Sequence, residues 1–188
     1  FNDVDLSPLS VHSRVALGLA RSYQITNVYQ KFSVLDNVVL AVQARTGSSL
    51  SFLRAFSRER EVFAQARDVI ERVGLADRMS ELALNLAHGE QRQLELGLAL
   101  ATTPKLLLLD EPMAGMGPEE SEAMVALLAK VRLDITLLLV EHDMDAVFRL
   151  ADRISVLVYG RIVATGTPDE IRRDPEVRKA YLGEEIAA

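Results

Sequence analysis

The chain has 188 residues, of which 49% are apolar and 26% charged, enough for one packed domain with a small subdomain. Its net charge of −6 argues against a general nucleic-acid binder, and the absence of cysteine excludes disulfides and thiolate metal sites. No apolar run approaches the roughly 18–20 residues that span a bilayer. The chain opens with no signal peptide and begins at Phe1 instead of Met, so we expect residues to be missing upstream.

The first part of the chain is predicted to be mostly helical. Residues 9–24 indicate a short helix followed by a strand or turn. A second helix is predicted from apolar side chains at helical spacing: Val34, Leu35, Val38, Val39 and Val42. Residues 47–49 interrupt the pattern, and an Arg-rich helix then runs from about 56 to 73, where Gly74 ends it. We therefore interpret residues 25–85 as an all-helical insert.

From Leu86 onward, helices and strands alternate, as in an α/β fold. The predicted elements are a helix that starts after residues 88–89 and runs to 101, a strand at 106–110, a helix at 118–132, a strand at 137–140 and a helix at 143–150. A hairpin at 154–164 and two short helices near Pro168 and Pro175 complete the chain.

Acidic and imidazole side chains follow two of the predicted strands. Asp110 and Glu111 end one apolar run, and His142 follows the next. Because the carboxyl ends of neighbouring parallel strands meet at one sheet edge, we expect His142 to lie beside Glu111. One carboxylate there suits a Mg²⁺ ion and the other suits a general base for an attacking water. Taken singly, the acidic turn fits a solvated surface turn as well as a hydrolytic site, and a lone histidine such as His142 is more often a structural or surface residue.

A turn at residues 86–90 opens the helix that precedes the first of these strands. Its glycine and its helix-start amides suit an anion, although a plain helix cap is commoner. Gln24 follows Tyr23 at the end of an extended segment and by itself indicates little. The residues of this turn are Leu86, Ala87, His88, Gly89 and Glu90.

These elements, in this order, resemble the ATP-binding subunit of ABC transporters. Residues 106–112 are similar to the Walker B strand, and residues 86–91 to the signature motif, here called the signature turn. Gln24 stands at the Q-loop position and His142 at the switch position. Three segments look like those of branched-chain amino acid uptake ATPases: the signature variant at residues 86–92, residues 141–144 and residues 180–184. Lipopolysaccharide-export ATPases share some of the tail.

The resemblance implies a P-loop NTPase (RecA-like) ABC ATPase core, N-terminally incomplete, at residues 1–24 and 86–188. Residues 25–85 are then the helical subdomain that contacts the permease.

The same resemblance implies the site residues of an ATPase that uses ATP and Mg²⁺. Asp110 is expected to reach Mg²⁺ through water, and Glu111 to be the general base. Gln24 is expected to sense Mg²⁺ and the lytic water, and His142 to contact the γ-phosphate. The signature turn is expected to close over ATP held by a second ATPase subunit.

The chain departs from the family pattern at several positions. Ala87 replaces the signature Ser, and His88 replaces a Gly. Gly117 stands where the D-loop, residues 113–117, has Asp or Asn. None of the 10 glycines is followed by Lys, so these residues hold no Walker A motif. We expect them by themselves neither to bind ATP tightly nor to hydrolyse it, and we expect an exposed apolar sheet edge.

The implied setting is the cytoplasmic face of the inner membrane, peripheral, with permease subunits and, indirectly, a solute-binding protein. The second ATPase subunit is identical to this one or a paralogue, and no nucleic acid is expected. Alternatives are a lipopolysaccharide-export-type ATPase and a catalytically dead permease-docking fragment. A DNA-repair or translation ABC protein fits less well, because the insert is short and the charge acidic.

Overall fold

The computed structural model describes residues 1–22, 28–46 and 55–182, which form two compact units, Phe1–Val140 and Glu141–Ala188. The first unit is built on a parallel sheet in the order β1-β2-β3, and its strands are Leu19–Arg21, Leu106–Asp110 and Thr136–Val140. Asp110 pairs in register with Val140, so β2 and β3 end together. The predicted parallel pair is confirmed.

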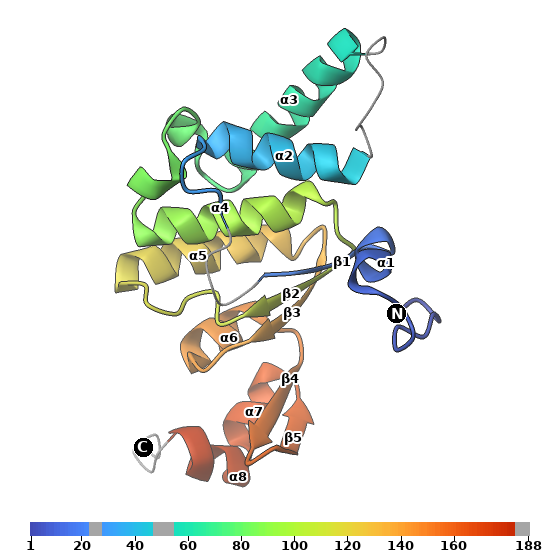
Figure 1. The fold of residues 1–188 in the computed structure, drawn as a ribbon. Helices are drawn as coiled ribbons and strands as arrows, with labels where there is room; N and C mark the ends of the chain where they lie inside the picture. Colours follow the sequence, from blue (N-terminus) through green and yellow to red (C-terminus); the bar gives the residue numbers. More distant parts are fainter. Residues whose placement is uncertain (23–27, 47–54, 183–188) are drawn as a thin grey trace. The chain divides into compact units, whose positions relative to one another are not determined.

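Helices cover one face of this sheet. Helix α4 (His88–Ala101) and α5 (Pro118–Val131) lie along the strands, and α1 (Val11–Ala16) precedes β1 (Figure 1). Pro118 sets the start of α5, because proline fixes a helical φ and has no N–H to leave unpaired. The buried side chains between these helices and the sheet include Leu94, Leu100, Leu107, Leu109, Met124, Leu128 and Val131.

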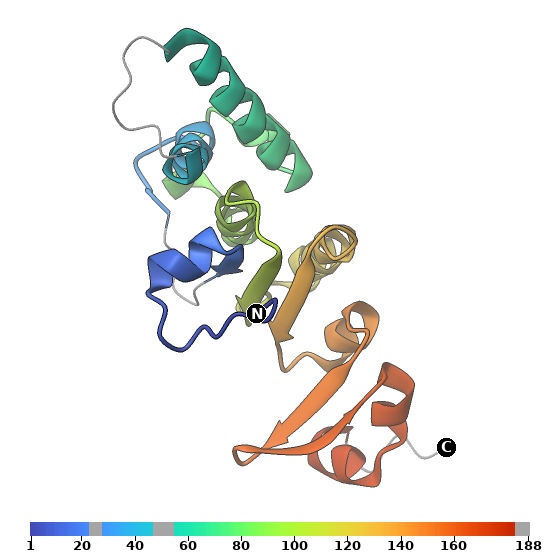
Figure 2. The same cartoon turned by 90° about the vertical axis from the view of Figure 1, so that its right-hand side faces the viewer.

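A helical layer packs on α4 on the side away from the strands, as both views show (Figures 1 and 2). It contains α2 (Val34–Thr46), α3 (Ala55–Arg72) and the short 3₁₀ turns η1 (Ala76–Arg78) and η2 (Ala83–Asn85). Its core consists of Val34, Val38, Val42, Val62, Ala66, Ile70, Val73 and Leu75. The predicted helices are confirmed in these two segments. The predicted break at residues 47–49 lies outside the described residues.

The second unit contains α6 (Met144–Leu150), the antiparallel hairpin β4 (Ile154–Val158) and β5 (Arg161–Gly166), and then α7 (Pro168–Arg173), α8 (Pro175–Val177) and η3 (Arg178–Leu182). Its small core is formed by Ile154, Val156, Ile171 and Val177. The hairpin and the proline-started helices are as predicted. The division into core 1–24 and 86–188 and helical subdomain 25–85 stays a prediction, because the two compact units cut the chain elsewhere.

The structure corrects several details. Helix α4 begins at His88 itself, earlier than expected, because Ala87 already has the extended backbone of an N-cap. β5 is longer than the predicted arm. β3 is not the buried strand that its apolar run indicates, since Leu138 and Val140 are 57% and 56% exposed. Among the described strands β3 pairs with β2 alone, so one of its long edges carries no described ladder. No described helix combines the length and apolar character needed to cross a membrane.

Candidate functional site

Asp110 and Glu111 lie at the carboxyl end of the central strand β2. The Glu111 N–H donates to the Val140 carbonyl at 2.9 Å, which continues the ladder to β3 by one residue. Glu111 adopts φ +46, in the left-handed region that costs a residue with a side chain about 1–2 kcal/mol. Strain of this kind is found where the fold holds a functional side chain in place. The sheet therefore ends in two carboxylates on a rigid edge.

Arg21 at the end of β1 is paired with Asp110. Its guanidinium lies 3.2 Å from the Asp110 Oδ2, and the two side chains are 53% and 36% exposed. β1 lies beside β2, with Arg21 in register with Leu108, which brings the guanidinium to the acidic edge. Because exposed pairs stabilise little, the contact matters mainly for the orientation of the Asp110 carboxylate. Sequence reasoning did not select Arg21 as a site residue.

The signature turn starts α4 without a capping hydroxyl. Ala87 has no side-chain acceptor, so only half of a capping box exists: Glu90 accepts from the Ala87 N–H at 2.9 Å. Arg78 donates to the other Glu90 oxygen at 2.9 Å, and this hydrogen bond raises the pKa of the guanidinium. Leu86 is buried in the core. Arg78 and Glu90 therefore hold the turn in the absence of a serine.

The Gly89 amide of the same turn is also occupied by a carboxylate of the chain. It donates to Glu120 Oε1 at 3.2 Å, and Glu120 Oε2 accepts from the Gly117 N–H at 3.1 Å. We expected the helix-start amides to face a phosphate by themselves, whereas here Ala87 and Gly89 already have acidic partners. An incoming anion at Gly89 has to replace Glu120. Apart from its place in the first turn of α5, no sequence feature singles out Glu120.

The D-loop lies against the signature turn. Gly115 has φ +77, and a side-chain carbon built on it would lie 3.3 Å from the His88 Cε1. The imidazole that replaces the family's glycine therefore faces a residue without a side chain. Gly117 is exposed, and a side-chain carbon built there meets nothing within 4 Å. The space for the family's Asp or Asn is open.

His142 and Gln24 lie outside the described part of the first unit, which contains Asp110, Glu111 and the signature turn. His142 belongs to the second unit, where its ring is 72% exposed and its Nδ1 lies 3.7 Å from Glu141 Oε2. Its expected place beside Glu111 stays a prediction. Gln24 lies outside the described residues. The structure thus holds Asp110, Glu111, the signature turn and Gly117 within one unit, and the Glu120 carboxylate links Gly89 of the turn to Gly117.

The acidic edge suits a magnesium ion that takes most of its ligands from water and a nucleotide. Among the described residues, no group of three or more His, Asp or Glu side chains forms a metal cage. Mg²⁺ does not need one, because it binds one or two carboxylates together with water and phosphate oxygens. Asp110 and Glu111 offer such hard oxygen donors. The residues present fit a magnesium ion that arrives with a nucleotide.

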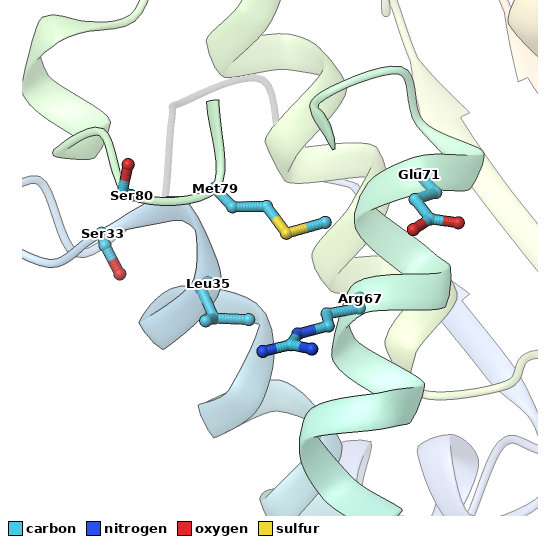
Figure 3. Close-up of a pocket in the computed structure, with 6 residues that line it drawn as sticks. All are labelled: Ser33, Leu35, Arg67, Glu71, Met79 and Ser80. Atoms are coloured by element: carbon cyan, nitrogen blue, oxygen red, sulfur yellow. The ribbon is translucent and has the colours of Figure 1, made fainter. Parts of the chain in front are cut away.

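The helical layer holds an open pocket of about 620 Å³ (Figure 3). Its walls come from the start of α2, from α3 and from the segment after η1: Ser33, Leu35, Arg67, Glu71, Met79 and Ser80. Figure 3 shows Leu35, Met79 and Arg67 pointing toward the same space. Exposed apolar side chains nearby in the chain include a stacked Tyr29–Phe32 pair. The surface combines apolar contact area with one cation and one acid.

Family models match two parts of the chain. Residues 6–114 match the model described as "ABC transporter". Residues 161–187 match the model described as "Branched-chain amino acid ATP-binding cassette transporter". The first match includes the signature turn and the acidic pair, and the second lies in the second unit.

Curated relatives and solved structures agree with these matches. The high-affinity branched-chain amino acid transport ATP-binding protein LivG of Salmonella typhimurium is 39% identical over 175 residues, 89% of this chain and 69% of the relative. BraF of Pseudomonas aeruginosa, of the same description, is 36% identical and covers 96% and 73%. The lipopolysaccharide export protein LptB of Escherichia coli is 29% identical. The crystal structure of MJ1267 in its ADP conformation, an ABC transporter cassette, has a TM-score of 0.78 at 25% identity, over 98% of this chain and 76% of that one.

Proposed function

Because this chain belongs to the family of ABC transporter ATP-binding subunits, we propose that it powers the uptake of branched-chain amino acids. The observation that carries the proposal is the acidic pair Asp110-Glu111 on a rigid sheet edge, in one unit with a signature turn. The likeness to LivG and BraF and the match over residues 161–187 support the substrate class.

Each carboxylate of the pair has a separate task in this proposal. Asp110 would hold a magnesium ion through a bound water, and such an ion would neutralise phosphate charge when it is bound. Glu111 accepts the proton of the attacking water, a contribution of typically 10²–10⁴-fold for a general base. Its left-handed backbone and its bond to Val140 fix its place at the strand end. Gln24 and His142 are proposed to contact the water and the γ-phosphate.

The signature turn acts in this proposal on the nucleotide of a second ATPase subunit. With Ala87 in place of a hydroxyl, recognition falls to backbone amides and to the positive end of α4. Gly117 adds no side chain to the same interface. The partner is a second copy or a paralogue. ATP and Mg²⁺ are the proposed ligands, and the residues for the phosphate-binding loop are not among these 188.

The pocket of the helical layer is the proposed docking place of a permease segment. Its apolar lining with Arg67 and Glu71 suits an amphipathic helix, and Tyr29 and Phe32 add exposed apolar surface, 62% and 44% exposed. This contact places the subunit peripherally at the cytoplasmic face of the inner membrane. A solute-binding protein is involved only through the permease.

Transport by the reassembled complex tests the proposal. The chain, joined to an N-terminal segment that carries a phosphate-binding loop, is combined with permease subunits and a solute-binding protein in liposomes, and ATP-dependent leucine uptake is measured; this assembly is the complex used in the tests below. Glu111→Gln is expected to lower uptake and ATP turnover about 10²-fold or more. Glu119→Gln removes the same charge from an exposed position at the start of α5 and is expected to keep both.

Three outcomes would contradict the proposal in different ways. Transport of lipopolysaccharide instead of leucine would support the export-type alternative. A complex that assembles without any turnover would support a docking role alone. Turnover that survives Glu111→Gln would remove Glu111 from the chemistry.

A further inference from the structure

The carboxylate of Glu120 lies at the start of two helices at once. It accepts one N–H from Gly89, the second residue of α4, and one from Gly117, the residue before α5. Helix starts carry unpaired N–H groups and the positive end of the helix dipole. A single carboxylate here satisfies one donor of the signature turn and one donor of the D-loop. Glu120 and Gly89, which form the first of these bonds, are 31 residues apart in the sequence.

The Glu120 carboxylate lies tightly against residue 89. A carbon built on Gly89 would lie 2.8 Å from Glu120 Oε1 and 3.0 Å from its Cδ. A side chain at residue 89 would therefore displace the carboxylate from its present place. The His88 ring over Gly115 makes a second contact between the same two segments. The turn and the loop are thus fitted to each other twice.

We propose that Glu120 is a positioning residue that fastens the D-loop to the signature turn and sets the direction of the Gly89 amide. Its carboxylate contacts no substrate. The positioning role of Glu120 rests on the proposed function in one respect: the anion that binds the Gly89 N–H is a phosphate of the ATP held by the partner subunit. The Glu120 carboxylate and the phosphate of the partner's ATP compete for the Gly89 N–H. When the two ATPase subunits close, the phosphate therefore replaces Glu120 at Gly89, while Glu120 keeps its bond to the Gly117 N–H.

Nuclear magnetic resonance of the isotopically labelled chain tests the bridge directly. Glu120→Gln is expected to move the Gly89 and Gly117 amide resonances together, because both amides lose a charged acceptor, and Glu119→Gln is expected to leave both in place. A shift of only one of the two resonances in Glu120→Gln, or an equal shift in Glu119→Gln, would overturn the bridge. In the wild type, scalar couplings across the two hydrogen bonds, from each glycine amide to the carboxylate carbon of Glu120, report the same bridge, so the test survives a variant that fails to fold.

The KM for ATP of the assembled transporter tests the positioning role. Glu120→Gln keeps an acceptor and removes the competing charge, so KM is expected to fall several-fold with kcat little changed. Glu120→Ala removes the tie to the D-loop, so KM is expected to rise. Equal KM values in both variants and in Glu119→Gln would overturn the role. A wild-type complex without ATP turnover would instead contradict the proposed function, and the amide resonances would still decide the bridge.

Discussion

Arg21 shows how a single side chain changes the chemistry available to a neighbour. Asp110 ends a strand as the sequence indicates, but its carboxylate is held by a guanidinium from the adjacent strand at 3.2 Å. Glu90 and Glu120 act on the signature turn in a comparable way, since each carboxylate accepts a hydrogen bond from a backbone N–H of the turn. At the acidic edge and at the signature turn alike, groups that are proposed to meet a ligand are thus already paired within the chain.

Replacing Arg21 by alanine is expected to strengthen magnesium binding with little change in stability. An exposed ion pair contributes about 0–1 kcal/mol, so the half-saturating Mg²⁺ concentration should fall by about 2–5-fold. Magnesium-dependent ATP turnover of the assembled complex and thermal unfolding measure the two effects. Arg60→Ala, an exposed arginine of α3, is the control. A higher magnesium requirement in Arg21→Ala would show that Arg21 supports the metal site.

At the scale of elements, polar side chains fix where helices begin. Asn37 in α2 is 1% exposed and binds the loop before its own helix: its Oδ1 accepts from the Tyr29 N–H at 2.8 Å, and its Nδ2 donates to the Tyr29 and Ser33 carbonyls at 3.0 and 2.9 Å. This loop carries Tyr29 and Phe32 of the proposed docking surface. The buried Asn37 side chain thus holds the loop that carries the exposed Tyr29 and Phe32.

Asn37→Ala is expected to cost about 2–3 kcal/mol of unfolding free energy, because it leaves buried backbone groups without partners. Denaturant unfolding measures the loss. Gln30→Ala changes an exposed amide of the same loop and is expected to be nearly neutral. Equal stability of the two variants would contradict the anchoring role of Asn37. Weaker permease binding by Asn37→Ala alone would support the docking surface.

Helix α7 gives a prediction about pH. The pKa of Glu170 is lowered by hydrogen bonds from the Thr167 N–H, the largest cause, and from its hydroxyl. Since the folded-state pKa lies below that of the unfolded chain, the bonds stabilise at neutral pH, and this contribution is lost as the pH falls through the folded-state pKa.

The stability difference between wild type and Glu170→Gln is therefore expected at neutral pH and should vanish once the pH has fallen below the folded-state pKa of Glu170. Hydrogen exchange in the second unit measures this difference. Asp169→Asn makes the same change of charge one residue earlier and serves as the control. A pH-independent difference would assign the effect to packing.

At the scale of the whole molecule, the chain consists of two compact units with separate cores. The first combines a parallel sheet with helices, and the second is a hairpin with short helices. Such units can open independently, which hydrogen exchange reports residue by residue.

Core substitutions in the two units are expected to act separately. Ile171→Ala and Ile70→Ala each remove a side chain with at most 2% exposure, at a cost of about 2–5 kcal/mol. Ile171→Ala should speed exchange within residues 141–182, and Ile70→Ala only within the first unit. Faster exchange across both units in either variant would show that the chain unfolds as one cooperative body.

The sequence by itself determined the kinds and order of the elements. Helical spacing in α2, Pro118 at the start of α5 and the apolar run before Asp110 are local patterns, and local patterns record which backbone a segment adopts. The candidate acidic pair and the signature turn follow from the same short motifs. Only the tertiary structure decided which groups meet. The Arg21–Asp110 pair spans 89 residues, the Glu120–Gly89 bond spans 31, and β3 is exposed in spite of its apolar run. Such contacts depend on strand register and helix packing, which no spacing within one segment contains.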